Sequence, residues 1–139
     1  MGRILCIDYG SKRIGTALSD PGKTIASPFK TLDFKSEEIL ISEVVSLIEE
    51  YDVEMLVVGY PIGMKGQKTL QTEKTEKFVE TLKSSISLPI VWIDERLSSV
   101  EAKRALRNQG IKPSRHKAMI DTTAAALILQ TYLDSRLYR

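Results

Sequence analysis

Soft metal ligands and common nucleophiles are scarce in this chain. It contains one cysteine, Cys6, and one histidine, His116. A single cysteine excludes an internal disulfide framework, and these two residues are too few for a structural zinc site. Neither a Ser-His-Asp nor a Cys-His arrangement competes strongly for a catalytic role. Any bound metal is therefore expected to be a hard cation that oxygen atoms hold.

Long apolar runs and low-complexity tracts are also absent. No stretch approaches the roughly 20 apolar residues of a membrane-spanning helix, and the first residues lack the pattern of a secretory signal. The 139 residues are 42% hydrophobic and 27% charged. This balance is typical of a soluble globular protein. We expect one domain over residues 1–139, a cytoplasmic location and no membrane partner.

The spacing of apolar residues changes clearly along the chain, from the pattern of strands to that of helices. Its first part predicts strands joined by tight turns, with Pro28 at an edge or a bulge. Ser36 is a plausible helix N-cap, and strands and helices alternate from there. The predicted strands are 3–9, 14–19, 24–34, 55–61 and 89–94, and helices are predicted from about 36 to 48, 69–84, 98–108 and 116–136.

This order predicts an α/β fold, a mixed five-stranded sheet with parallel central strands and helices on both faces. In such sheets, ligands bind beyond the carboxyl ends of the strands. Asp8, Gly59 and the pair Asp94-Glu95 all lie at such ends. The sequence therefore predicts a site that contains carboxylates.

Each acid also has a structural interpretation. Asp8 either caps the turn before Gly10 or belongs to the site, and Arg96 could simply neutralise an acid at the rim of the sheet. Asp94 and Glu95 point to opposite faces of a strand, so at most one readily joins Asp8.

Two further acids are considered as candidate site residues. Asp121 is either the N-cap of the last helix or lies inside a helix that begins at Ser114, on the side of Ala125 and Ile128. Asp20 is assigned to its own Asp-Pro-Gly turn.

Carboxylates from separate elements repel one another unless a cation holds them. Mg²⁺, or Mn²⁺ in its place, suits an oxygen-only site and retains water and phosphate ligands. Two such ions about 4 Å apart can activate a water molecule and stabilise the leaving oxygen of a phosphodiester. The acids therefore indicate a metal-dependent site for nucleic acid.

A basic segment follows the last acidic pair. A segment of this kind follows a phosphate backbone or is a solvated helix face. Lys12 and Arg13 add charge beside Asp8. The candidate nucleic-acid-binding residues are Lys12, Arg13, Arg96, Lys103, Arg104, Arg107, Arg115 and Lys117.

Four blocks, "DYGSKRIGTALSD", "VVGYPIGMKG", "DERLSS" and "DTTAAALILQ", resemble the YqgF family, in the same order and across nearly the whole chain. That family is described as RuvC-like within the RNase H-like superfamily. The resemblance implies a single RNase H-like nuclease domain. It implies Asp8, Glu95 and Asp121 as catalytic metal ligands, with Asp94 in reserve. RuvC-like nucleases carry an acid at the end of the central strand, where this chain has Gly59-Tyr60, so Glu95 would have to substitute from the neighbouring strand.

The resemblance also implies the function. It indicates a metal-dependent endonuclease that matures the 5′ end of 16S ribosomal RNA precursor, or a resolvase of Holliday junctions in branched DNA. A non-catalytic RNA-binding assembly factor is a further alternative. The sequences of actin-like kinases also begin with Asp-x-Gly followed by a hairpin, which would make the chain a nucleotide-dependent enzyme. Those proteins use two such domains, however, and this chain lacks a phosphate-binding loop motif. The oligomeric state stays open, a homodimer included.

Overall fold

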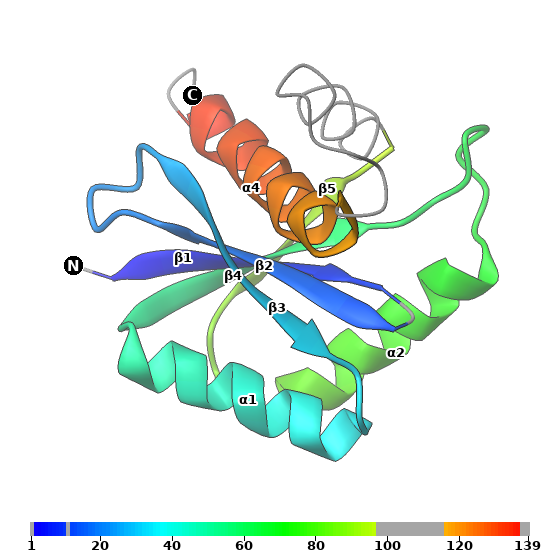
Figure 1. Ribbon diagram of the computed structural model, residues 1–139, viewed down its shortest axis with the longest axis horizontal. Coiled ribbons are helices and arrows are strands. Elements are labelled where there is room, and N and C mark those ends of the chain that lie inside the picture. Colours follow the sequence, from blue (N-terminus) through cyan, green and yellow to red (C-terminus); the bar gives the residue numbers. More distant parts are fainter. Residues whose placement is uncertain (1, 11, 97–115, 137–139) are drawn as a thin grey trace.

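The computed structural model describes residues 2–10, 12–96 and 116–136, and in the last range it describes side chains from Thr122 onward. One sheet runs through the molecule, with two helices below it and one above in Figure 1. The elements are β1 (Arg3–Tyr9), β2 (Arg13–Ser19), β3 (Ala26–Asp33), α1 (Glu37–Glu50), β4 (Val53–Tyr60), α2 (Leu70–Lys83), β5 (Ile90–Asp94) and α4 (His116–Arg136).

The strands form a mixed sheet in the order β3-β2-β1-β4-β5. β1 pairs with β2 and β2 with β3 in antiparallel fashion, as tight turns require. β1, β4 and β5 are parallel neighbours. The carboxyl ends of these three strands therefore meet at one edge of the sheet.

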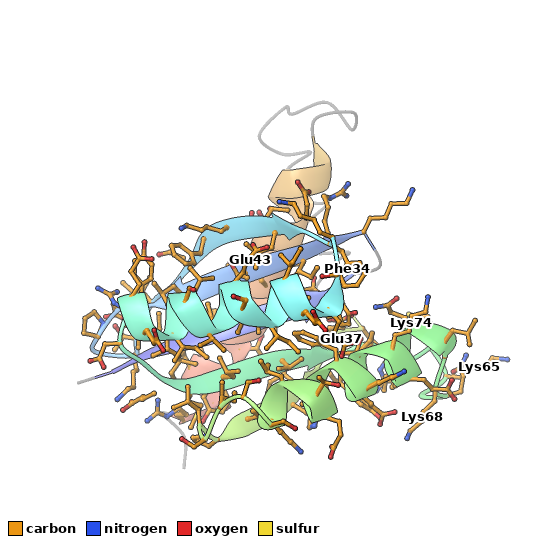
Figure 2. All side chains as sticks on the ribbon, turned by 90° about the horizontal axis from the view of Figure 1, so that it is seen from below. Phe34, Glu37, Glu43, Lys65, Lys68 and Lys74 are labelled. Atoms are coloured by element: carbon orange, nitrogen blue, oxygen red, sulfur yellow. The ribbon has the colours of Figure 1, made fainter. Side chains whose placement is uncertain are left out.

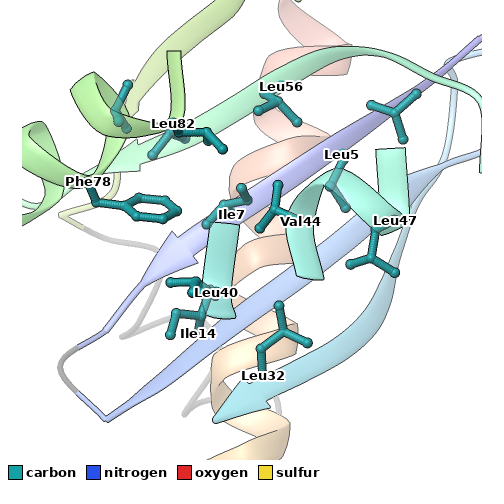
Figure 3. Packing of buried hydrophobic residues seen from close by; sticks show 13 residues of the cluster. Leu5, Ile7, Ile14, Leu32, Leu40, Val44, Leu47, Leu56, Phe78 and Leu82 are labelled. Atoms are coloured by element: carbon teal, nitrogen blue, oxygen red, sulfur yellow. The ribbon is translucent and has the colours of Figure 1, made fainter. Parts of the chain in front are cut away.

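Alternating side chains give the sheet two buried faces. Leu5 and Ile7 of β1 pack toward α1 and α2, and Figure 3 shows them against Val44 and Phe78. Ile4 and Cys6 point the other way, into a second cluster with residues of α4. We name these the α1/α2 face and the α4 face. Because both are covered, the central strands are continuously apolar, which confirms the prediction from residues 55–61.

The helix starts also follow the sequence. The Ser36 hydroxyl accepts a hydrogen bond from the Ile39 N–H and caps α1, as predicted. Thr69 caps α2 in a reciprocal arrangement with Thr72. α1 and α2 lie side by side beneath the sheet, where Figure 2 shows exposed lysines on α2 and on the loop before it.

The predicted third strand begins two residues too early. Asp20 Oδ1 accepts hydrogen bonds from the N–H groups of Thr24 and Ile25, so these residues belong to the turn. The turn assignment of Asp20 is thus confirmed. β3 begins at Ala26, and Pro28 lies in this edge strand beside a register shift, as predicted. The predicted helix 98–108 lies outside the described residues.

The five-stranded mixed sheet with helices on both faces is therefore confirmed. Among the described residues, no helix is both long and apolar enough to cross a bilayer.

Candidate active site

Asp8 lies near the carboxyl end of β1, half-buried, directly after the core. Ile4, Cys6 and Asp8 occupy every second position of β1, so Asp8 lies on the α4 face with the other two. Across the hairpin it pairs with Gly15, a residue without a side chain. Behind it, the Gln71 side chain of α2 donates a 2.8 Å hydrogen bond to the Tyr9 carbonyl oxygen. That contact fixes the backbone immediately after Asp8.

Glu95 follows the last residue of β5 and lies on the same face. Val91 and Ile93 of that strand pack in the α4-face cluster, and Glu95 continues their alternation. Its backbone N–H lies 3.4 Å from the Tyr60 carbonyl oxygen, which extends the pairing of β4 with β5 by one residue. This extension turns the Glu95 side chain toward the ends of β1 and β4.

Gly59 leaves the room that Glu95 uses. A Cβ at position 59 would collide with Glu95 Oε2 and would come within 3.0 Å of Ile128 Cδ1 on α4. Glu95 Oε2 is buried, and among the described residues it has no hydrogen-bond partner. A carboxylate from the neighbouring strand therefore lies over the end of the central strand.

The proton affinity of Glu95 reflects this crowding. Burial, then the negative charge of Asp8 and a hydrogen bond shared with it, raise the pKa of Glu95 from 4.5 to about 9. Burial together with the same two carboxyl groups also raises the pKa of the Cys6 thiol beneath them. Asp8 and Glu95 are thus close enough to repel when both are ionised.

Asp94 has a different environment. It is exposed, and the Arg96 guanidinium binds it through Nε at 2.8 Å and Nη2 at 2.7 Å. The hydrogen bonds from Arg96 lower the pKa of Asp94. The structure brings Glu95, and not Asp94, next to Asp8, and the predicted opposition of the two neighbours is confirmed.

Asp121 lies inside α4, five residues after the helix begins, so its interpretation as an N-cap is wrong. α4 runs antiparallel to β4, because Ile128 lies over Gly59 and Tyr132 contacts Met55 at the start of the strand. Position 121 is two helical turns before Ile128, on the same side of the helix, which carries it past the end of β4. The Asp121 side chain lies outside the described part of the chain.

The donor atoms suit a hard divalent cation. They are carboxylate oxygens, one of them buried with no hydrogen-bond partner in the described part of the chain, and a cation would relieve the repulsion between the two groups. Among the side chains that the structure describes, no three of the metal-binding types come together. Asp8 and Glu95 form a pair, to which only a residue outside that set could add a third.

The predicted basic residues are only partly described. Lys12 is exposed in the turn between β1 and β2, Arg13 is half-buried at the start of β2, and Arg96 binds Asp94. Lys117 lies in α4, without a described side chain. The remaining four, Lys103, Arg104, Arg107 and Arg115, lie outside the described residues.

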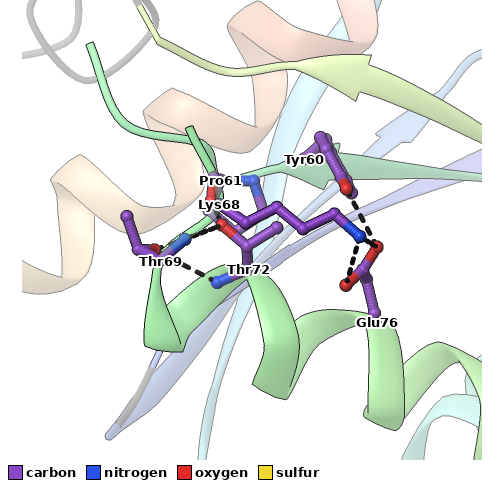
Figure 4. Close-up of polar contacts among 6 residues, drawn as sticks. All are labelled: Tyr60, Pro61, Lys68, Thr69, Thr72 and Glu76. Carbon is purple, nitrogen blue, oxygen red and sulfur yellow. Dashed lines mark hydrogen bonds and ion pairs between the residues drawn. The ribbon is translucent and has the colours of Figure 1, made fainter. Parts of the chain in front are cut away.

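Sequence reasoning missed a polar network on the other side of the same sheet edge. Tyr60 donates a 2.9 Å hydrogen bond to Glu76 of α2, and Lys68 forms a 3.1 Å ion pair with the same carboxylate (Figure 4). Thr72 donates to the Pro61 carbonyl oxygen. No sequence motif indicates this network, because its residues come from a strand, a loop and a helix.

Comparisons with known proteins show the family of the chain. A family model described as RuvX, Holliday junction resolvase, matches residues 2–135. A Chloroflexus aurantiacus protein is 45% identical over 96% of this chain and 87% of its own length. A Dictyoglomus thermophilum protein is 39% identical over 96% of each. Both are provisionally named pre-16S rRNA nucleases.

Two solved structures share the fold at low sequence identity. RuvC from T. thermophilus, in complex with a Holliday junction substrate, has a TM-score of 0.62 and 12% identity, over 99% of this chain and 96% of that one. A fowlpox virus resolvase with Holliday junction DNA has a TM-score of 0.59 and 11% identity, over 97% and 99%. The expected RuvC-like fold is therefore confirmed.

Proposed function

The chain belongs to the RuvX family of Holliday junction resolvases, and on that premise we propose that it is a divalent-metal-dependent endonuclease for structured nucleic acid. We assign metal binding to Asp8, Glu95 and Asp121. Asp94 is a poorer candidate because Arg96 already binds it. Residues 1–139 act as one nuclease domain in this proposal.

One observation carries the assignment: the Glu95 carboxylate lies beside Asp8, over Gly59, with a buried oxygen that has no partner among the described residues. A carboxylate kept there for stability alone would be costly, since burial and Asp8 both oppose its charge. A site for a cation accounts for both the burial and the repulsion.

The residues divide the chemistry in a simple way. When bound, a divalent cation, Mg²⁺ in our proposal with Mn²⁺ as a substitute, would supply an acidified water molecule and would offset charge on the phosphate. Asp8 and Glu95 would hold the cation through their oxygens, at strand ends whose positions the sheet fixes. Gln71 keeps the end of β1 in place. α4 packs on this face of the sheet.

We propose that the substrate is the 5′ end of pre-16S rRNA, in the cytoplasm. The names of the relatives at 45% and 39% identity support this choice. A second candidate is Holliday junction resolution, which the family description favours. Resolution of a junction requires two symmetric cuts and hence two active sites, so a homodimer belongs to the second candidate. Sedimentation of the protein with each substrate separates the two.

The decisive experiment incubates the protein with a pre-16S rRNA fragment and a synthetic four-way DNA junction, each with Mg²⁺, Mn²⁺ or EDTA. Asp8→Asn should lower the cleavage rate by on the order of 10²-fold or more. Asp20→Asn is the matched control, because Asp20 holds a turn and should affect only stability. Full cleavage in EDTA, or by Asp8→Asn, would remove the metal mechanism.

A further inference from the structure

An aromatic pair lies at the outer edge of the sheet, beside the candidate active site. Trp92, the sole tryptophan of the chain, is 36% exposed on β5, which ends the sheet on that side. Its ring makes an edge-to-face contact with Tyr60, with 5.1 Å between centroids and 74° between planes. Tyr60 is held in turn by its hydrogen bond to Glu76. Trp92 therefore presents a supported aromatic surface to solvent.

Two cations accompany this pair. Lys68, whose side chain is 60% exposed, forms an ion pair with Glu76, the acid that also binds Tyr60. Arg96 is held by Asp94, which pairs with Tyr60 in the register of β4 and β5. Arg96 Nη1 lies 3.8 Å from the place of a Cβ at Gly66, in the loop that carries Lys68. Both cations are thus fixed around the same end of β4 and β5.

The aromatic pair and the carboxylates occupy opposite faces of the sheet. Tyr60 reaches α2 on the α1/α2 face, and Trp92 contacts it there, whereas Glu95 lies on the α4 face. A polymer that contacts both must pass around β5 or its end. A double helix is too stiff to bend around one strand, because its persistence length is about 150 base pairs. An unpaired strand bends freely and offers bases for stacking.

We propose that Trp92, supported by Tyr60, stacks against an unpaired base of the substrate, and that Lys68 and Arg96 bind neighbouring phosphates. The proposal rests on the function proposed above and names its substrate class: a strand that is single-stranded next to the cleavage site. Aromatic stacking with flanking cations is the usual way to bind such a strand without reading its sequence.

The test measures binding in EDTA, where cleavage plays no part. The probe is a single-stranded oligoribonucleotide on the order of ten nucleotides long, compared with its blunt duplex. The single strand should quench Trp92 fluorescence, and the duplex should not. In anisotropy titrations, Trp92→Leu should weaken binding about tenfold, and Trp92→Phe should retain most of it. Lys68→Gln should lower the slope of log affinity against log salt by about one.

The chain offers a matched control at the opposite edge of the sheet. Phe29 of β3 also makes an edge-to-face contact, with Tyr51, and Lys30 lies 5.2 Å from its ring centroid. Phe29→Leu should leave binding unchanged. Equal loss in Phe29→Leu and Trp92→Leu would assign the effect to stability and overturn the inference.

The remaining outcomes separate the two proposals. If wild-type protein cleaves but Trp92→Leu binds as tightly as wild type, the stacking surface is wrong and the nuclease stands. If the duplex binds and quenches as well as the single strand, the single-strand preference is wrong. If binding depends on Trp92 but Mn²⁺ never produces cleavage, the surface stands and the nuclease proposal fails.

Discussion

Gly59 shows how one missing side chain shapes the candidate site. The RuvC-like pattern has an acid at the end of the central strand, whereas here the neighbouring strand supplies Glu95. The two residues are coupled, because the Glu95 carboxylate occupies the place of a Cβ at position 59. Any side chain at 59 has to displace it. The clash involves the flexible end of Glu95, so the fold should tolerate a substitution that the site does not.

Gly59→Ala is therefore expected to fold with nearly normal thermal stability and to lose most metal-dependent cleavage. The measurements are a thermal melt and a cleavage rate at saturating Mn²⁺. Gly22→Ala is the control, because its Cβ would approach a carboxylate oxygen of Asp20, at 3.2 Å, in a turn away from the site. Full cleavage by Gly59→Ala would mean that the position of Glu95 has no role.

The raised pKa of Glu95 leads to a prediction of how the stability of the metal-free protein depends on pH. In the unfolded chain it ionises near 4.5, whereas burial and Asp8 raise its pKa to about 9 in the folded protein. Between these values the folded state holds the extra proton. Its stability should therefore be greatest below pH 4.5 as far as Glu95 contributes, and should fall as pH rises toward 9.

Glu95→Gln removes this titration. In EDTA, the variant should gain stability over wild type, and the gain should be larger at pH 8 than at pH 5. Urea denaturation at both values measures it. An equal difference at the two values would show that folding does not raise the pKa of Glu95.

At the scale of elements, the start of α2 holds the loop that follows β4. Thr69 Oγ1 accepts a 3.3 Å hydrogen bond from the Thr72 N–H, and Thr72 Oγ1 accepts a 3.0 Å bond from the Thr69 N–H. Thr72 also donates to the Pro61 carbonyl oxygen. The same two threonines thus cap the helix and hold the loop against the strand end.

Thr69→Ala should lower the free energy of unfolding by about 1 kcal/mol, the usual effect of a lost cap. Thr69→Ser keeps the hydroxyl and should retain most of the stability. Ser36→Ala at the start of α1 should cost a similar amount, since it also removes a cap bond, the one from the Ile39 N–H. Urea denaturation measures all three. A Thr69→Ala protein as stable as wild type would show that the loop, and not the cap, fixes the start of α2.

Helices and strands whose apolar residues recur at regular spacing could be predicted from the sequence. Ser36 and Pro28 were informative because a helix cap and an edge-strand proline have local physical causes. The prediction of Thr24 as a strand residue is wrong because its N–H donates a hydrogen bond to Asp20, a contact that the apolar pattern does not encode.

The site could be predicted as a set of strand ends, but not as a geometry. Asp8 and the Asp94-Glu95 pair lie where parallel strands end, and alternation left one acid of the pair for the site. Two features separate the acids: the ion pair of Arg96 with Asp94, which is a local contact, and the space above Gly59 that the Glu95 carboxylate occupies, which depends on tertiary packing. The network of Tyr60, Lys68 and Glu76 depends on how α2 packs, so no local pattern could indicate it.

At the scale of the whole molecule, three strand ends and α4 converge on a pair of acids that repel, and binding of a cation should therefore stabilise the entire fold. A ligand that binds only the folded state adds about 1.4 kcal/mol at ten times its dissociation constant. For a domain of this size, that gain raises the melting temperature by about 3–6 °C. We expect this rise in melting temperature when Mn²⁺ replaces EDTA at pH 8.

The variants Asp8→Asn and Glu95→Gln test where the cation binds. In EDTA, both should melt at a higher temperature than wild type, because the repulsion between the two carboxylates is removed. Addition of Mn²⁺ should raise their melting temperatures almost no further, because each variant lacks one ligand. Asp20→Asn, which leaves the site intact, should melt lower but should show the full rise. An equal rise in Glu95→Gln and in wild type would place the cation elsewhere on the molecule.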